Sequence, residues 1–259
     1  MTCCKDIAEY IENLCPLSLA CDWDNVGLLV GDKDKKISKV LICLDNDEKV
    51  TDEAEKLDAD MIISHHPIMF SPINRMTEDD PQQRMIRKMC ALDICHYAAH
   101  TNMDCASGGL NDYLAEKLGF TNTEIVEKTT DNAGFGRIAG CDMTLGEAIS
   151  LCKEKLGLET VSYVGEPQKK IKKVVINSGS GSSILPLCIE KDVDLLITGD
   201  LKYNVARDAY ENNVTVIDAG HYGTEIIFTE LMKEYLEKEF SDVEFIISKA
   251  NVPVIKVDK

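Results

Sequence analysis

Four of the five histidines of this 259-residue chain stand where an apolar, strand-like segment ends. They are His65 and His66 in DMIISHHP, His100 in DICHYAAH, and His221 in VTVIDAGH. A neutral imidazole is the commonest metal ligand among side chains, and histidine also serves as a general acid or base. Their recurrence at one kind of position predicts a metal site. The alternative is that each is a hydrogen-bonded turn or core residue.

Two carboxylates accompany these histidines at a repeated spacing. Asp104 follows His100 in the motif HTNMD, and Glu225 follows His221 in the motif HYGTE, so both motifs read H-x-x-x-[DE]. Imidazole combined with carboxylate suits zinc, manganese, iron or nickel better than calcium, which prefers oxygen ligands. The eleven cysteines contain no C-x-x-C pair, which argues against a thiolate zinc site.

The adjacency of His65 and His66 raises a geometric question. Neighbouring side chains of a regular strand point to opposite faces of the sheet. Pro67 follows directly, ends the hydrogen-bonded ladder and keeps His66 extended or in a turn. The two imidazoles could then face one cavity and bind one metal ion each.

The carboxylate of Glu225 is predicted to lie at the start of a helix. Thr224 is a suitable N-cap for the apolar pattern that follows it, which includes Phe228 and Met232. Glu225 would then lie in the first helical turn, where the helix dipole favours a negative charge.

Other polar or aromatic residues have two interpretations each. Asp200 in LLITGD either supports a metal ligand or faces a substrate, or else it forms a helix N-cap. His96 lies inside a strand pattern and is expected to be packed. The run SGSGSS (Ser178–Ser183) favours a tight strand-to-helix turn over a phosphate loop, because it matches neither glycine-rich nucleotide motif. Trp23, the single tryptophan, is expected to anchor the core.

The elements that position these residues occur twice along the chain. Lys35–Leu44 reads KKISKVLICL, and Lys169–Asn177 reads KKIKKVVIN. At the same separation, DADMIISHH corresponds to DVDLLITGD, so Asp200 takes the place of His66. A third pair of strands ends at His100 and His221, after a polar loop that lengthens the first half.

Short apolar strands that alternate with helical patterns predict βαβ units and an α/β fold with mainly parallel sheets. We predict two related α/β domains, residues 1–125 and 126–259, with the last metal motif returning to a shared cleft. The alternative is one continuous sheet from interleaved halves. In open α/β sheets the carboxyl ends of the strands bind ligands, and the histidines stand there.

Composition narrows the class of protein. Hydrophobic residues make up 44% of the chain and charged residues 28%, as in globular proteins. The apolar runs are too short to cross a membrane, and the start, MTCCKDIAEYIENL, is acidic where a signal peptide is basic. We therefore expect a cytoplasmic protein. The formal net charge of −17 disfavours direct binding to nucleic acid.

With these residues in view, the sequence resembles the Nif-three-like family, whose members are labelled GTP cyclohydrolase I type 2 homologues. The resemblance rests on motifs along nearly the whole chain: PLSLACDWDNVGLLVGD, IISHHP, AAHTNMD, GFGRIAG, SGSGSS, LLITGD and DAGHYGTE. The chain is similar to the short form, which lacks an inserted middle domain.

The resemblance implies a dinuclear metal centre in the cleft between two α/β domains, and a toroidal homohexamer. The metal ligands that it implies are His65, His66, Asp104, His221 and Glu225. His100 is implied to line the site.

The activity that the resemblance implies is hydrolytic opening of the guanine imidazole ring of GTP. Two divalent metal ions would activate a water molecule, and His100 or Asp200 would carry protons. One alternative is metal binding or metal delivery, or a ring-shaped interaction scaffold, without turnover. Another is regulatory binding to nucleic acid or to a transcription factor, of which direct DNA binding is disfavoured by the charge.

Overall fold

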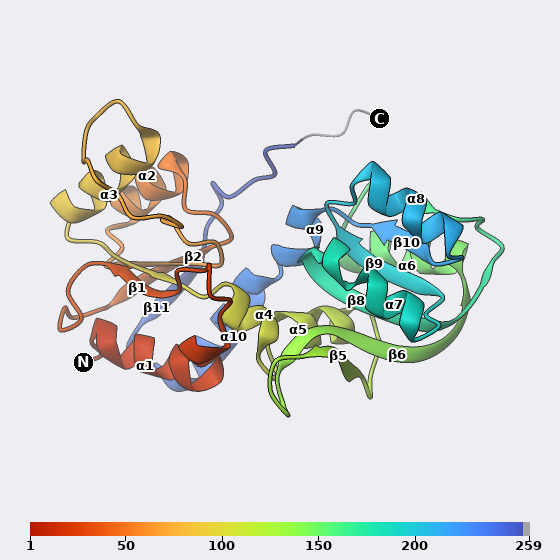
Figure 1. Cartoon of the computed structure of the whole chain (residues 1–259). Coiled ribbons are helices and arrows are strands. Elements are labelled where there is room, and N and C mark those ends of the chain that lie inside the picture. Colours follow the sequence, from red (N-terminus) through yellow and green to blue (C-terminus); the bar gives the residue numbers. More distant parts are fainter. Residues whose placement is uncertain (256–259) are drawn as a thin grey trace. The chain divides into compact units, whose positions relative to one another are not determined.

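The computed structural model describes residues 1–255, which form two compact units (Figure 1). Of the described residues, the first unit contains Met1–Met103 together with 228–255, and the second contains Asp104–Ile227. Each unit has its own sheet and its own hydrophobic core.

The described residues of the first unit form a five-stranded sheet in the order β1-β4-β3-β2-β11. Its strands are β1 (Gly27–Val30), β2 (Lys39–Cys43), β3 (Met61–Ser64), β4 (Cys95–Ala98) and β11 (Glu244–Ile247). Only β1 pairs antiparallel in this sheet, so its described part is mainly parallel as predicted. Every residue of β3 and β4 is buried, as expected for strands covered on both faces.

Helices cover both faces of the first sheet (Figure 1). Those on one face are α2 (Glu48–Leu57) and α3 (Pro81–Ala91), and those on the other are α1 (Cys4–Leu14) and α10 (Phe228–Glu239). The side chain of Asp47 accepts the N–H of Val50, and that of Asp80 accepts the N–H of Gln83. These N-caps satisfy helix donors that have no partner within the helix and so define where α2 and α3 begin.

The second unit contains a six-stranded sheet in the order β5-β6-β8-β9-β10-β7, among its described residues. The strands are β5 (Glu124–Lys128), β6 (Gly134–Thr144), β7 (Ser162–Val164), β8 (Lys170–Ser180), β9 (Leu195–Gly199) and β10 (Thr215–Asp218). Strand β9 pairs parallel with β8 and β10, and the remaining pairs are antiparallel. The expectation of mainly parallel sheets is therefore wrong for this unit, because β5, β6 and β7 add antiparallel strands at both edges of a parallel centre.

The helices of the second unit are α5 (Leu110–Lys117), α6 (Leu145–Leu156), α7 (Leu185–Glu190), α8 (Tyr203–Glu211) and α9 (His221–Glu225). The short helix α4 (Thr101–Cys105) spans the point where the chain passes from the first unit to the second. A capping box between Thr144 and Glu147 begins α6, and Gly157 in the left-handed conformation ends it. The buried core includes Val175, Leu196 and Val216 from three adjacent strands.

The compact units are arranged differently along the chain from the predicted halves 1–125 and 126–259. Strand β11 pairs parallel with β2, and helix α10 belongs to the same unit, so the C-terminal part of the chain completes the first sheet. Residues 104–125 belong to the second unit. The internal repeat covers only the central strands of each sheet. It therefore does not predict that β11 and α10 join the first unit or that residues 104–125 join the second. The described strands form two sheets, not one continuous sheet.

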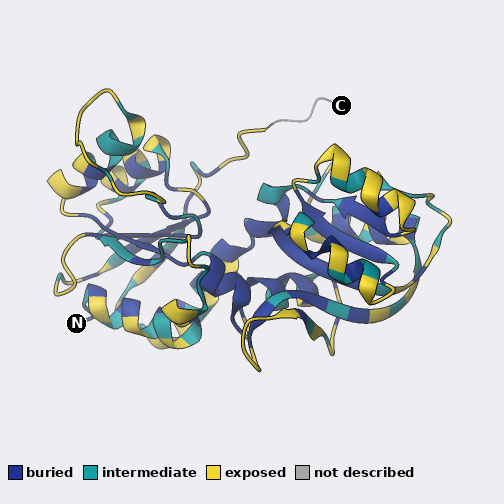
Figure 2. Ribbon diagram, in the orientation of Figure 1, coloured by how far each residue is buried: buried dark blue, intermediate teal, exposed yellow. Residues whose placement is uncertain are grey.

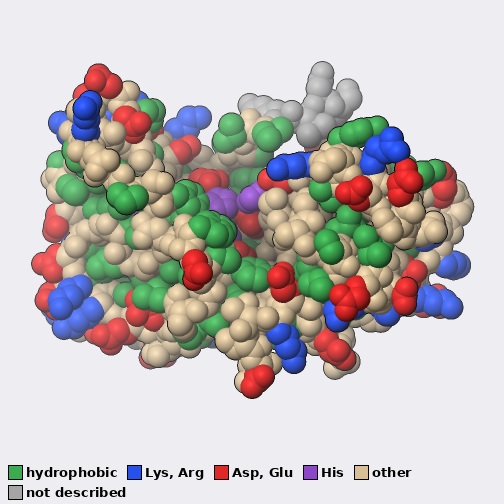
Figure 3. Space-filling model, viewed as in Figure 1, with side chains coloured by type: hydrophobic (Ala, Val, Ile, Leu, Met, Phe, Trp, Pro, Cys, Tyr) green, Lys and Arg blue, Asp and Glu red, His purple; other side chains and the backbone are tan. Residues whose placement is uncertain are grey.

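Most strand residues are buried, and the helices that cover them bury one face and expose the other (Figure 2). The expectation that Trp23 anchors the core is wrong, because this residue is 61% exposed. Its neighbours Asp24 and Asn25 are held in a loop, which turns the indole outward. Acidic and basic side chains are interspersed on the visible surface (Figure 3). Within residues 1–255, no helix has both the length and the apolar character that a membrane span requires.

Candidate functional site

The first unit brings together three of the predicted residues, His65, His66 and His100, which we call the histidine group. One ring nitrogen of each lies within 4.8 Å of a ring nitrogen of the other two. His65 and His66 follow β3, and His100 follows β4, the parallel neighbour of β3. The carboxyl ends of these two strands therefore supply all three imidazoles, in agreement with the strand-end pattern.

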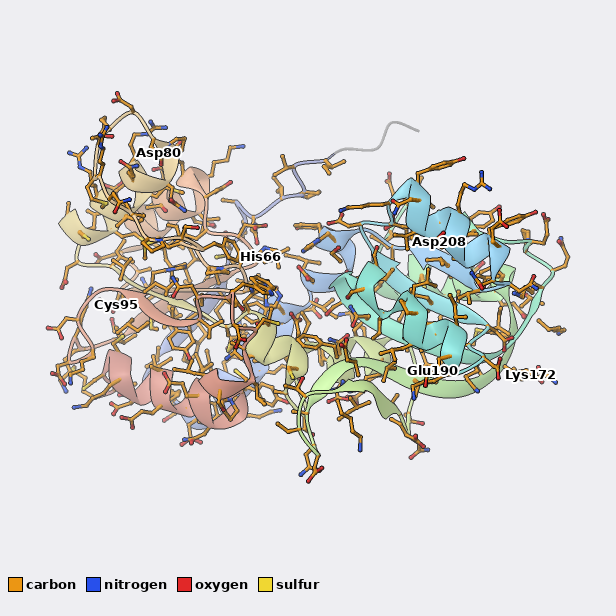
Figure 4. The ribbon with its side chains drawn as sticks, viewed as in Figure 1. His66, Asp80, Cys95, Lys172, Glu190 and Asp208 are labelled. Atoms are coloured by element: carbon orange, nitrogen blue, oxygen red, sulfur yellow. The ribbon has the colours of Figure 1, made fainter. Side chains whose placement is uncertain are left out.

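The adjacent histidines face one region although they are consecutive in the chain. Their ring centroids lie 5.1 Å apart, and each ring centroid is 5.1–5.3 Å from that of His100. The backbone N–H of His66 still donates to the carbonyl of Leu44, after which Pro67 cannot donate. The end of the ladder at this point allows the second ring to turn toward the first. Figure 4 labels His66 in the loop beyond β3.

All three imidazoles are oriented through the same ring atom. The Nδ1 atom of His65 lies 2.8 Å from the carbonyl oxygen of Ala99. In the same way, Nδ1 of His66 lies 2.7 Å from Oδ1 of Asp45, and Nδ1 of His100 lies 2.9 Å from Oδ1 of Asp24. These oxygens accept hydrogen bonds, so Nδ1 carries a hydrogen in each ring, and Nε2 is the nitrogen that holds the lone pair in the neutral form. Imidazoles that bind metal through Nε2 have this arrangement.

Asp24 is a buried carboxylate that is held by several hydrogen bonds. Its side chain is fully buried and accepts hydrogen bonds from the backbone and hydroxyl of Thr101 as well as from His100. Burial by itself would raise the pKa of Asp24, but the hydrogen bonds from His100 and Thr101 outweigh it and lower the pKa to about 2. Asp24 is therefore ionised and holds the His100 ring in place.

The sequence patterns did not identify Asp24 or Asp45 as partners of the histidines. Asp45 had a usable signal, because it follows the end of β2 and so lies at the same sheet edge as His66. Asp24 had none, because it lies in an irregular loop far from His100 in the chain. Its position depends on the folded path of that loop.

The second unit brings together Asp104, His221 and Glu225, which we call the acidic group. Nε2 of His221 lies 2.8 Å from Oε2 of Glu225, and a carboxylate oxygen of Asp104 lies within 4.8 Å of one of Glu225. Asp104 is 8% exposed and Glu225 is 4% exposed. Two buried carboxylates this close attract a proton or a cation, because their mutual repulsion is costly in a low dielectric.

Asp200 orients His221 as Asp45 orients His66. Its Oδ2 lies 2.7 Å from Nδ1 of His221. The hydrogen bond from His221 to Glu225 is the main cause that raises the pKa of His221 to about 9, and Asp200 adds to it. The alternative that Asp200 caps a helix is wrong, because α8 begins after Lys202, which occupies the cap position.

The backbone around Glu225 differs from the prediction. Thr224 is not an N-cap: it lies inside α9, which begins at His221 after Gly220, so Glu225 ends this short helix. The hydroxyl of Thr224 donates to the carbonyls of Gly220 and His221 and accepts the N–H of Gly179. These bonds connect the helix to the SGSGSS segment.

The SGSGSS segment approaches the acidic group closely. Gly179 has φ +58, and a Cβ on it would meet Oε1 of Glu225 at 1.9 Å. The neighbouring Ser178 hydroxyl donates to Oδ1 of Asp104 over 3.2 Å. The segment continues from β8 into a 3₁₀ turn at Gly181–Ile184, as the turn interpretation predicts. The need for glycine here comes from the nearby carboxylate.

His96 is a packed strand residue, as expected. It is fully buried in β4, and its Nε2 lies 2.9 Å from the hydroxyl of Ser64, which in turn donates to the carbonyl of His66. Among the described residues, Nδ1 of His96 has no hydrogen-bond partner. Burial lowers the pKa of His96 to about 3, so its ring is neutral.

Both groups have ligand types suited to divalent transition metals. The histidine group offers three oriented Nε2 atoms, and the acidic group offers carboxylate oxygens and one more Nε2. This combination of imidazole and carboxylate suits zinc, manganese, iron and nickel.

Comparisons with known proteins agree with this fold. Residues 2–253 match the family described as Duf34/NIF3 (NGG1p interacting factor 3). A Clostridium perfringens protein named "GTP cyclohydrolase 1 type 2 homolog" is 40% identical over 253 residues, covering 95% of each chain. A crystal structure of a Bacillus cereus protein related to NIF3 has a TM-score of 0.89 and 25% identity, covering 99% of each chain.

A Staphylococcus aureus hypothetical protein is also similar in structure, with a TM-score of 0.91 and 28% identity over 99% of each chain. The family match extends over nearly the whole sequence, and the resemblance inferred from the motifs is confirmed. This chain belongs to the Duf34/NIF3 (NGG1p interacting factor 3) family.

Proposed function

We propose that this protein is a metal-dependent hydrolase of a nucleotide or a related small molecule, with two divalent metal ions per chain. His65 and His66 of the histidine group would hold one ion, and the acidic group would hold the other. The observation that carries the proposal is the shared orientation of His66, His100 and His221. Each directs Nδ1 to a carboxylate, which leaves Nε2 as the ring atom that would face a metal ion at His66 and at His221.

The residues divide into ligands and proton carriers. The ligands are His65, His66, Asp104, His221 and Glu225. His100 and Asp200 carry protons, since each is hydrogen-bonded to a second titratable group that can share a proton with it.

When bound, divalent ions supply Lewis acidity and lower the pKa of a nearby water molecule toward about 7. Around them, the chain itself fixes the imidazoles. Asp24 and Asp45 hold His100 and His66, so these rings need little reorganisation when a ligand arrives.

The first substrate to test is GTP. Relatives carry the name "GTP cyclohydrolase 1 type 2 homolog". The reaction that the resemblance implies is hydrolytic opening of the guanine imidazole ring with release of formate. Water is the only co-reactant of this step. Formate release from GTP, measured after loading with zinc, manganese, iron or nickel, is the expected activity.

The deciding experiment measures bound metal by mass spectrometry on protein purified without a chelator or a histidine tag. We expect about two ions per chain in the wild type, and a loss of metal in His66→Ala and in Glu225→Gln. Glu190→Gln is the matched control for the second variant, because Glu190 is exposed at the end of α7 (Figure 4). Wild-type protein that takes up no metal after loading with any of the four ions would refute the proposal.

Metal uptake without any turnover would instead favour a metal-binding or delivery role. Light scattering on the same preparation tests the homohexamer that the resemblance implies.

A further inference from the structure

Two exposed aromatic side chains flank His100 in the first unit. Trp23 is 61% exposed and Phe70 is 50% exposed, although large aromatic residues usually bury most of their surface. Their ring centroids lie 6.3 Å apart at an interplanar angle of 34°. Each centroid is also 5.8 Å from that of His100, which meets both rings edge to face.

The loops that carry these rings are fixed by polar contacts. Asp24, next to Trp23, is fully buried against His100 and Thr101. Asn25 donates from Nδ2 to the carbonyl of Met69 over 2.7 Å and so connects the Trp23 loop to the residue before Phe70. Both aromatic rings are therefore held in place while much of their surface remains in water.

The arrangement of Trp23 and Phe70 indicates which ligand shape would fit against them. Two rings tilted by 34° with centroids 6.3 Å apart leave no room for a third ring between them, so they form one wall. A flat ring that stacks on this wall would lie near His100, whose ring centroid is 5.8 Å from that of each aromatic ring. A wholly apolar ligand would strip water from His100 and His66 without replacing its hydrogen bonds. A heteroaromatic ring combines an apolar face with a polar edge and avoids this cost.

We propose that Trp23 and Phe70 form a stacking platform for the heteroaromatic ring of the substrate, a nucleobase in the first instance. The proposal rests on the proposed function and deepens it, since it assigns the residues that would hold the base of the nucleotide beside His100. The chain contains a single tryptophan, so tryptophan fluorescence reports on Trp23 alone.

The test is a fluorescence titration of metal-free protein in the presence of EDTA. Guanosine monophosphate is the ligand, and ribose 5-phosphate is the control that lacks the base. We expect saturable quenching by guanosine monophosphate only. Phe70→Ala should weaken binding about tenfold, in the range that stacking on an aromatic side chain supplies. Tyr203→Ala should leave binding unchanged, since Tyr203 is an exposed aromatic residue of the second unit.

Equal effects of the two ligands, or no quenching at millimolar concentration, would overturn the platform. Light scattering on Trp23→Ala/Phe70→Ala gives an independent check: a smaller assembly than the wild type would show that the pair joins copies of the chain, against the proposal. Because binding is measured without metal or turnover, quenching in a protein that takes up no metal would support the platform and reject only the hydrolase.

Discussion

Nδ1 of His221 lies 2.7 Å from Oδ2 of Asp200, and Nδ1 of His66 lies 2.7 Å from Oδ1 of Asp45. In each unit, a carboxylate that follows one parallel strand is hydrogen-bonded to a histidine that follows the neighbouring strand. Asp45 follows β2 and serves His66 after β3, while Asp200 follows β9 and serves His221 after β10. The two pairs share this geometry although the repeat aligns Asp200 with His66 and His221 with His100, so they do not lie on corresponding strands of the two halves.

The first prediction concerns the hydrogen bond between His221 and Asp200. Asp200→Asn replaces an obligate acceptor by an amide that can donate to Nδ1, which destabilises the tautomer with a free Nε2 lone pair. We expect metal affinity to fall roughly 10–100-fold, as for other partners of metal-binding histidines. Competition with a chromogenic chelator measures this.

Asp208→Asn is the control for Asp200→Asn, because it removes the same charge from the exposed face of α8 (Figure 4). Equal affinities of the two variants would show that Asp200 does not orient a ligand.

The second prediction concerns the buried His96. Its folded-state pKa is about 3, below the ordinary value of 6.5, because burial penalises the charged ring. Between these values the unfolded chain binds a proton that the folded chain does not. The stability that neutral His96 contributes is therefore complete above pH 6.5 and is lost as the pH falls toward 3.

His96→Gln should reduce the slope of unfolding free energy against pH in this window by up to about 1.4 kcal/mol per pH unit. Urea unfolding of metal-free protein at several pH values gives the slope. A slope comparison remains valid even when the variant is less stable overall. Identical slopes in wild type and variant would contradict the prediction.

The third prediction concerns Gly179. Gly179→Ala places a methyl group where Oε1 of Glu225 lies at 1.9 Å, on a backbone with φ +58. Gly157→Ala has nearly the same backbone cost, with φ +65, but nothing within 4 Å of the added Cβ. Both variants should lose about 1–2 kcal/mol from the left-handed conformation.

Only Gly179→Ala should also displace Glu225 and reduce the metal content. Denaturant midpoints and metal analysis on the two variants separate these effects. If both variants retain full metal content, the close approach of Gly179 to the carboxylate is not required.

The fourth prediction concerns the loop that carries Trp23. Asp24→Asn keeps the shape of a fully buried side chain but removes an acceptor used by His100 and Thr101. We expect a loss of about 1–3 kcal/mol in stability, because buried donors lose their partner. Trp23 should gain mobility, seen as lower fluorescence anisotropy. Asp22→Asn, at an exposed position in the same loop, should change neither quantity.

Much of the fold followed from local patterns. The buried strands β2, β3 and β4, and their counterparts β8, β9 and β10, are short apolar runs whose repetition predicted α/β units. The edges of the sheets did not follow, since the antiparallel pairing of β7 with β10 and the parallel pairing of β11 with β2 depend on contacts between distant segments. Hydrophobic pattern marks a strand, but it does not identify its neighbour.

Sequence by itself determined which histidines belong to a candidate site. Strand ends are encoded locally, and the carboxyl ends of parallel strands meet at one edge, so the strand-end pattern alone grouped His65, His66 and His100. The family assignment likewise rested on local motifs. What only the tertiary structure decided was the set of groups around them: Asp24 behind His100, Gly179 against Glu225, and Trp23 exposed instead of buried. These relationships join loops that are distant in the chain, and their positions arise from packing and hydrogen bonds that no periodicity records.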